Sequence, residues 1–487
     1  MMSDIHGITR ASGLTYDEHV ELEQLVRVFG RMRGRNAMLE HYYEGDVMAR
    51  DIGVKMLPEN ATISVDLSCD WARKAVNALA DLVRFDGFVF EGIDEDAATS
   101  RIMRDGFGAV FARARIGILK NGCAFVTVGG TMGRSFVRVH GANDGAGIMD
   151  PTSDRLRSGF VIAESARTAW SRKNIVPTRV NLYMPGSRVS LVRDGATEWH
   201  AERFETPEGV MMMVPMCFAP TDTKPLGSTR ITRQVRDLVD DVLRVRLALV
   251  MSTAFYAVPM RVFLGLTDDQ YEAMLESKWG AMLNPFSLLT KDEDSDIPNP
   301  TPYQFPSNSP QPLIDLIQND AKLFASATGI PLNSLGVVQD NPSSAEAIAE
   351  ARKDLTDTAQ SLIDGQLTPA LREVALLAMM VEGNVETAEG LTKEQQTVLP
   401  HFVNPAMPSI SASTDAAMKI ASVNPAFAQT DEFFRMVGFD VPTINRVNRQ
   451  MRLNAARANG SSFIREQEPQ QANGFQLATN EGATDED

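Results

Sequence analysis

The first part of the chain carries apolar residues at helical spacing. From Leu22 to Phe29 the apolar positions fall one, three or four residues apart and share one face of a helix. The run "KNG" at residues 120–122 is typical of a helix C-terminus, because it places a basic residue just before a glycine. These patterns predict four helices, over residues 15–44, 68–84, 94–104 and 108–121.

The apolar period then changes from that of a helix to that of a strand. The stretch "CAFVTVGGTMGRSFVRVH" (123–140) alternates around a glycine-rich turn, which predicts two strands joined as a hairpin. Residues 1–226 are therefore expected to form an α+β domain. Further strands are predicted over residues 159–165, 179–185, 187–195 and 209–218.

A long helix is predicted from about residue 228 to 256, and its apolar positions form a heptad-like seam. This seam can pack on the helix's own domain or against the same helix of other copies, and the pattern is compatible with both. Opposite charges four residues apart occupy the other faces, in Arg233/Asp237, Arg236/Asp240 and Asp240/Arg244. The seam consists of Ile231, Val235, Leu238, Val242, Val245 and Leu249.

A small mixed segment is predicted over residues 259–309. It contains a strand-like "MRVFLG", a helix near 267–278, and a proline-rich stretch that is expected to be extended. A second helix follows over residues 311–328, where apolar residues again share one face.

The stretch "GVVQDNPSSAEAIAEAR" (336–352) begins as a polar loop and ends as a helix. An Asn-Pro pair breaks the chain just before Ser343, and Ser343 with Glu346 has the spacing of a capping box. The helix is predicted to run to about residue 382. Because Gly365 and Pro369 fall inside it, a kink or break is expected there.

The remaining residues predict shorter helices and a tail. "STDAAMKIASV" and "PTINRVNRQMRLNAARA" are helical patterns within residues 384–458, and residues 459–487 have the polar, acidic composition of a disordered segment. The predicted fold class is thus α+β and mainly α-helical.

Composition narrows the possible functions. The net charge is −16 at pH 7, which argues against a protein that grips nucleic-acid phosphates tightly. Cys69, Cys123 and Cys217 are far apart in the sequence, odd in number and without a C-x-x-C pattern, so neither a disulfide framework nor a zinc site is expected, and a reducing compartment fits. No signal peptide and no membrane-spanning helix are predicted, so the protein is expected to be intracellular when made.

Motifs of catalysis are absent from the sequence. It contains no Walker A loop and no G-x-S-x-G, and its six histidines form no metal-binding pattern. "GGTMGRS" (129–135) is interpreted as a hairpin turn, while "FEGIDED" (90–96) and "KDEDSD" (291–296) are interpreted as solvated acidic loops. No catalytic residue, metal or cofactor is predicted.

The order of these elements resembles that of the portal proteins of tailed bacteriophages. The resemblance covers roughly residues 20–458 and is strongest where several short stretches recur in order. These stretches are "YYEG" (42–45), "LP" (57–58), "ATGIPLNSLG" (327–336), "NPSSAEAI" (341–348) and "STDAAMKI" (413–420).

The resemblance implies a division of the chain into the parts of a portal subunit, assembled as a ring with an axial tunnel. It implies a wing over 1–226, a first stem helix over 227–258, a clip over 259–309, a second stem helix over 310–330, a tunnel loop over 331–343, a long kinked helix over 344–383, a crown over 384–458 and a disordered acidic tail over 459–487.

The same resemblance implies a function and site residues. The ring, of 12 copies by analogy, would sit at one capsid vertex of the virion after assembly in the host cytoplasm, without a membrane. Its implied partners are double-stranded DNA, the terminase large subunit, a head-tail connector or adaptor, and the major capsid and scaffolding proteins. The implied site residues are Ser334, Gln339, Asp340 and Asn341 facing DNA, the cap residues Ser343 and Glu346, the seam residues above as stem packing, and Trp279 and Phe286 in the clip.

The acidic composition agrees with a channel, because strong contacts to phosphates would hold DNA in place rather than let it slide. Three alternatives stay open at this stage. The segment 331–343 can be a plain surface loop, the protein can be another capsid- or connector-associated structural protein, or it can be an enzyme, such as a nuclease or protease, that uses scattered carboxylates.

Overall fold

The structure is a computed structural model in which the chain forms two compact units, Met1–Ala406 and Met407–Asp487. Each unit is described by itself. The described residues are 7–46, 67–93, 95–153, 155–167, 175–194, 198–256, 261–266, 269, 272, 288–291, 301–304, 309–336, 350, 352–406, 410–440 and 443–454.

The four helices predicted for the first part of the chain are confirmed, with one correction. The helix predicted over 68–84 ends early, at Ala80, because the chain then turns into strand β1 (Arg84–Val89). That strand pairs with β13 (Leu399–Val403), and neither was predicted. A short 3₁₀ turn, η1 (Gly7–Arg10), precedes the helices, which are α2 (Tyr16–Glu44), α3 (Trp71–Ala80), α4 (Ala97–Arg104) and α5 (Phe107–Asn121).

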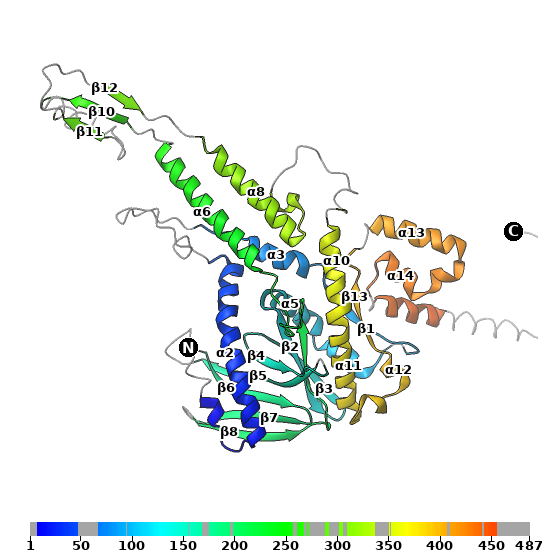
Figure 1. Cartoon of the computed structure of the whole chain (residues 1–487). Coiled ribbons are helices and arrows are strands. Elements are labelled where there is room, and N and C mark those ends of the chain that lie inside the picture. The colour runs from blue at the N-terminus through cyan, green and yellow to red at the C-terminus, as the bar shows by residue number, and fades with distance from the viewer. Residues whose placement is uncertain are drawn as a thin grey trace, which may run out of the picture. The chain divides into compact units, whose positions relative to one another are not determined.

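Two antiparallel sheets make up most of the β structure of the first unit (Figure 1). The predicted strands are all present, and the strands β4 and β8 were missed. The smaller sheet has the order β3-β2-β9, with β2 (Cys123–Thr131), β3 (Arg134–Gly141) and β9 (Met213–Cys217). The larger sheet runs in sequence order through β4 (Gly145–Met149), β5 (Leu156–Arg167), β6 (Ile175–Met184), β7 (Ser187–Asp194) and β8 (Glu198–Glu205).

The glycine-rich stretch 129–135 is the turn of the β2–β3 hairpin, as predicted. Gly130 has a φ of +143°, and a Cβ there would lie 2.2 Å from the carbonyl oxygen of Arg134. Only glycine fits so close an approach of backbone to backbone. This contact is a structural reason for the glycine, independent of any phosphate.

Helix α2 covers the larger sheet and forms the smaller of the two hydrophobic cores. Its predicted stripe is buried there, and Phe29 meets Phe160 of β5 with ring centroids 5.2 Å apart. The larger core lies between the smaller sheet and the helices α3, α5, α6 and α11. The apolar faces of α2, α3, α5 and α11 are therefore covered by a sheet or another helix.

The second half of the first unit is dominated by helices. Helix α6 (Arg233–Tyr256) leads into a small sheet of order β11-β10-β12, and helix α8 (Gln311–Thr328) follows it. The strands are β10 (Arg261–Leu266), β11 (Leu288–Lys291) and β12 (Thr301–Gln304). The strand predicted at "MRVFLG" is thus confirmed. Of the helix predicted near 267–278 only residues 269 and 272 are described, and both are helical. After η4 (Leu332–Leu335), the unit continues with α10 (Lys353–Leu362), α11 (Thr368–Gly383), η6 (Ala388–Gly390) and α12 (Lys393–Gln396).

Between α10 and α11 the helix takes a π-helical turn, Ile363–Leu367, where a kink or break was expected. Pro369 stands within the first turn of α11, where its missing N–H and fixed φ are tolerated. The helix therefore passes both Gly365 and Pro369 without ending, and α11 packs on β2 and β3.

The second unit is helical where it is described. The pattern "STDAAMKIASV" lies within α13 (Ile410–Val423), followed by η7 (Pro425–Gln429), α14 (Asp431–Val437) and helical residues 443–454. Among the helices that the structure describes in either unit, none is long and apolar enough to cross a membrane.

The N-terminus of α2 holds a charge that should make stability depend on pH. Glu18 closes a capping box with Thr15 and receives two hydrogen bonds from Arg203 of β8, at 2.7 and 2.9 Å. Burial raises the pKa of Glu18, but the hydrogen bonds from Arg203 and Thr15 outweigh it and hold that pKa below its ordinary value. The carboxylate therefore stabilises the fold when ionised.

We expect Glu18→Gln to lower the free energy of unfolding by about 1 kcal/mol at neutral pH. The difference in unfolding free energy between the variant and wild type should be largest above about pH 4.3, the pKa of a glutamate in the unfolded chain. It should disappear as the pH falls through the lower pKa of Glu18 in the folded protein. Thermal melts of both proteins at neutral and acidic pH measure it. Glu23→Gln, which removes an exposed partner of Arg27 on the same helix, is the control and should change little. An equal effect of Glu18→Gln at both pH values would contradict the assignment.

Candidate functional site

Helices α6 and α8 lie side by side and connect the larger core to the small sheet (Figure 1). The predicted seam of α6 is already covered within the single chain over its first half. Ile231, Val235, Leu238 and Val242 are buried in the larger core, while Val245 and Leu249 are half-buried. The packing of these first four side chains is thus that of a helix on its own domain.

The charges on α6 are arranged differently from the predicted spacing. Arg233 and Asp237 pair at 3.7 Å, as their separation of four residues predicts. Asp240 instead accepts hydrogen bonds from the hydroxyl of Tyr42 on α2, 3.1 Å from each carboxylate oxygen, and Arg244 pairs with Asp241 at 2.5 Å. Burial, together with the Asp240 charge, raises the pKa of Tyr42 to about 12, so this phenol stays a hydrogen-bond donor.

Apolar side chains remain uncovered on the helix pair. Leu316 and Leu323 of α8 are 49% and 46% exposed, and Val250 of α6 is 36% exposed. The two leucines are seven residues apart and therefore share one face of α8. We call these two leucines the α8 stripe. Large apolar residues repeated at heptad spacing on an exposed face are typical of a helix that packs against a partner.

Residues 227–231, which we call the root, hold the start of the helix pair in the fold. The N–H of Ser228 donates to the carbonyl of Phe218 at 2.7 Å, and the N–H of Arg230 donates to the carbonyl of Leu119 at 2.7 Å. These bonds hold the segment against the ends of β9 and α5. They explain why α6 begins at Arg233 rather than at the predicted 228.

Two glycines let the root approach the end of α5. Gly122 and Gly227 have φ values of +101° and +83°. A Cβ on Gly227 would lie 2.5 Å from the carbonyl oxygen of Gly122 and 2.6 Å from that of Phe218. No L-residue with a side chain fits between them, so the close contact depends on glycine.

The side chain of Arg230 joins the root to two helices, α8 and α3. Its guanidinium donates to the carbonyl of Thr328, at the last turn of α8, and to the carbonyl of Ala75 of α3 at 3.4 Å. Burial lowers the pKa of Arg230 to about 10, so the group remains charged at neutral pH. The carbonyl end of α8 is the negative end of its dipole and a favourable place for this charge.

The segment that follows α8 is anchored where the structure describes it. Gly329 ends α8 with a φ of +66°, and a Cβ there would meet the Cβ of Asp354 at 3.3 Å, so the end of α8 lies on the start of α10. Ile330 is buried and Leu335 packs on the larger core. Ser334, a predicted site residue, is half-buried, and its N–H donates to the carbonyl of Pro331 at 2.9 Å.

Several predicted site residues lie outside the described residues, so their side chains are not placed. They are Gln339, Asp340 and Asn341 of the predicted tunnel loop, the cap residues Ser343 and Glu346, and Trp279 and Phe286 of the predicted clip.

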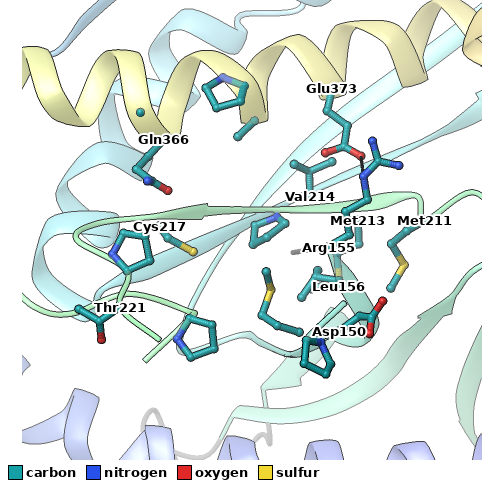
Figure 2. A pocket seen from close by; sticks show the side chains of 18 of the residues that line it. Asp150, Arg155, Leu156, Met211, Met213, Val214, Cys217, Thr221, Gln366 and Glu373 are labelled. Carbon is teal, nitrogen blue, oxygen red and sulfur yellow. Dashed lines mark ion pairs between the residues drawn. The ribbon is translucent and has the colours of Figure 1, made fainter. Parts of the chain in front are cut away.

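A cavity of about 720 Å³ lies between β9, the π-helical turn and the loops next to β4 and β5 (Figure 2). Its walls are rich in methionine and proline, and Cys217 lines it. Glu373 of α11 and Arg155 approach to 3.6 Å across it, and burial raises the pKa of Glu373. Sequence analysis did not find this cavity, because its walls come from segments far apart in the chain. Within the part of the chain that is described, no three His, Cys, Asp or Glu side chains come close enough to hold a metal ion.

The chain is similar in sequence to the portal proteins of two mycobacteriophages. The chain is 26% identical over 270 residues to the portal protein of Mycobacterium phage L5 and 25% identical over 268 residues to that of Mycobacterium phage D29. Each match covers 53% of this chain and 52% of the relative, so the chain spans about half the length of the curated relatives it matches. The resemblance to phage portal proteins seen in the sequence is thereby confirmed.

The chain was also compared with protein-family models and with solved structures. No protein-family model matches the chain. Among solved structures, the chain is similar to the neck of a native GTA particle computed with C12 symmetry, with a TM-score of 0.40 and 13% sequence identity, over 76% of this chain and 89% of that chain.

The contacts of Arg230 predict how its substitution changes the stability of the protein. Arg230→Met keeps much of the side-chain volume but removes the charged donor from the carbonyl of Thr328 and the longer contact with that of Ala75. The free energy of unfolding should therefore fall by about 2–3 kcal/mol. Arg233→Met is the matched control, because the Arg233 side chain is 88% exposed and its change should stay within about 0.5 kcal/mol. Chemical denaturation of the two variants measures both values. Equal, small losses would show that Arg230 does not hold the root.

Proposed function

We propose that this chain is a subunit of a phage portal, a ring at one vertex of the capsid through which double-stranded DNA is packaged and ejected. The similarity to the portal proteins of phages L5 and D29 carries the proposal. A subunit of this kind acts mechanically, as a channel and a docking platform, without a catalytic residue or a cofactor. Its location is the virion, after assembly in the host cytoplasm.

The parts of the fold correspond to the parts of such a subunit. The sheets and helices of residues 1–226 are the wing, helices α6 and α8 are the stem, and the small sheet within 259–309 is the clip. Residues 331–343 are the tunnel loop and 344–383 the long helix. Its described part from Lys353 to Gly383 stays continuous through a π-helical turn. Residues 384–458 are the crown and 459–487 the tail.

The α8 stripe supports assembly into a ring. Leu316 and Leu323 are about half exposed in a single chain, although each is a large apolar side chain at heptad spacing. Packing against the stem of the next subunit removes this surface from water, and burying one leucine fully contributes about 1.5–3 kcal/mol. A ring of 12 copies repeats that contact between every pair of neighbours.

Charge supports passage of DNA. The net charge of −16 opposes tight phosphate binding by the chain as a whole. Ser334, Gln339, Asp340 and Asn341 are the proposed DNA-facing residues of the tunnel loop, where short polar side chains allow contacts that break easily. The clip, with Trp279 and Phe286, is the proposed surface for the terminase large subunit and the head-tail connector, and the wing meets the capsid and scaffolding proteins.

Ring formation is tested by the double variant Leu316→Asp/Leu323→Asp. The purified wild-type chain should form closed rings of high mass, seen by mass photometry and negative-stain microscopy. The double variant should stay folded by circular dichroism, because both side chains are half exposed already, but ring formation should fall at least tenfold.

The control for this test is Gln311→Asp/Gln318→Asp. It adds two carboxylates to exposed positions of α8, also seven residues apart, but on a different face of the helix. Rings of normal size are expected from it. A wild-type chain that is monomeric alone and with its capsid partners would overturn the proposal, and rings without a central channel would favour another structural protein of the capsid.

The tunnel loop is tested by deleting residues 337–341. Because Leu335 packs on the larger core, the deletion begins after Gly336 and leaves that anchor in place. We expect normal rings and a loss of at least tenfold in packaged or retained DNA, measured with assembled capsids. A second variant that replaces the same five residues by Gly and Ser keeps the loop length and shows whether length or side-chain chemistry matters. Normal packaging by the deletion variant would make 331–343 a plain surface loop.

A further inference from the structure

Two cysteines that are far apart in the sequence face each other in the smaller sheet. Cys123 is the first residue of β2, Cys217 is the last of β9, and the two are direct partners in the antiparallel ladder. The ladder hydrogen bonds fall on alternate pairs, from Phe218 N–H to Gly122 at 2.8 Å and from Val128 N–H to Met212 at 3.0 Å. Cys123 and Cys217 are therefore a non-hydrogen-bonded pair. The side chains of such a pair project from the same face of the sheet.

This position suits a disulfide. Directly opposite residues of a non-hydrogen-bonded pair have Cα atoms about 4.5 Å apart, and disulfides bridge Cα separations of about 4.4–6.8 Å. The bond can therefore form without separating the strands or moving them together. Both cysteines are free thiols in this structure.

One of the two thiols borders a space that a reagent can enter. Cys217 lines the 720 Å³ cavity together with Met213 and Pro215, which lie on the same face of β9 (Figure 2). Cavities of about 300–1,000 Å³ hold small organic molecules. Cys123 has no exposed surface, and it is not among the residues that line the cavity. Any modification from solvent must therefore begin at Cys217.

We infer that Cys123 and Cys217 form a modification site, at which a low-molecular-weight disulfide entering the cavity converts the dithiol into an intrachain disulfide. In the first step, the Cys217 thiolate attacks one sulfur of the reagent, breaks its S–S bond and releases one reagent thiolate. In the second step, Cys123 loses its proton and attacks the sulfur of Cys217, which releases the second thiolate. Two protein thiols are oxidised, one reagent disulfide is reduced to two thiols, and the protons pass to the released thiolates.

Disulfide formation between Cys123 and Cys217 is slow, because both thiols are buried. Burial raises the pKa of Cys123 to about 12 and also raises that of Cys217, so few thiolates exist at neutral pH. Brief exposure to an oxidant leaves the dithiol intact, whereas lasting exposure in an oxidising compartment closes it.

The bond would reinforce the base of the helix pair. Cys123 follows Gly122, and Cys217 precedes Phe218, the residue whose carbonyl accepts from Ser228 of the root. A disulfide at this place ties β2 to β9 one residue from the contact on which the root depends. The thermal midpoint of the oxidised protein should therefore be higher than that of the reduced protein.

Peptide mapping tests the inference on the full chain. The native, reduced protein is incubated for hours at about pH 8.5 with 2-hydroxyethyl disulfide, where the thiolate fraction is larger than at neutral pH. It is then denatured, alkylated and digested without reductant. We expect one linked pair of peptides, containing Cys123 and Cys217, and an alkylated Cys69. Cys69 is the internal control, because its exposure of 5% matches the 6% of Cys217 and it lies outside the sheet, just before helix α3.

Two conservative variants test the order of the steps. Cys123→Ser should stop at a stable mixed disulfide on Cys217, and Cys217→Ser should leave Cys123 free to be alkylated after denaturation. Circular dichroism of both checks that the fold is kept. The inference is overturned if both thiols of the native wild type stay unmodified, if Cys69 pairs with either of them, or if Cys123 reacts as fast in Cys217→Ser as in wild type.

Discussion

The placement of the helix pair depends on the buried guanidinium of Arg230. Its charge contacts backbone carbonyls of α3 and α8, and the carbonyl of Thr328 at the end of α8 would lose this donor if the side chain were withdrawn. A buried polar group without a partner costs about 1–3 kcal/mol, so the end of α8 is held next to the start of α6. The small sheet and the segment after α8 are both attached to these helices. Their positions within the first unit therefore follow from the root.

The neighbours of the root form one connected structure. Strand β9 leads from the 720 Å³ cavity, through Cys217, to Phe218 and the root. The π-helical turn lines the same cavity from the other side, and α11 beyond it packs on β2 and β3. Helix α6, the cysteine pair and the long helix thus meet around one sheet. In the proposed portal ring, such a base would keep the two stem helices fixed relative to the sheet.

Much of the fold could be predicted from the sequence, because period and end signals are local. The helices α2, α4, α5, α6 and α8 and the β2–β3 hairpin follow from spacing and turn residues alone. The strands β1 and β13 could not be found that way, since each is short and is stabilised by a partner on the far side of the sequence. β8 was missed because it is an edge strand with mostly exposed, charged residues. The seam of α6 was found, but spacing alone could not say which surface covers it.

The sequence by itself determined which residues can be helix, strand or turn, because these preferences arise from a residue and its close neighbours along the chain. It also determined an acidic surface and the resemblance to phage portal proteins. Only the tertiary structure decided which distant residues meet. In the tertiary structure the first half of the α6 seam is buried in its own domain, whereas Leu316 and Leu323 stay uncovered. The backbone of Gly227 comes so close to that of Gly122 that only glycine fits there. The tertiary structure also placed Cys123 opposite Cys217, although spacing in the sequence suggested three unrelated thiols. The reason is physical: strand register and helix packing are set by burial and hydrogen bonding between segments, which no local pattern contains.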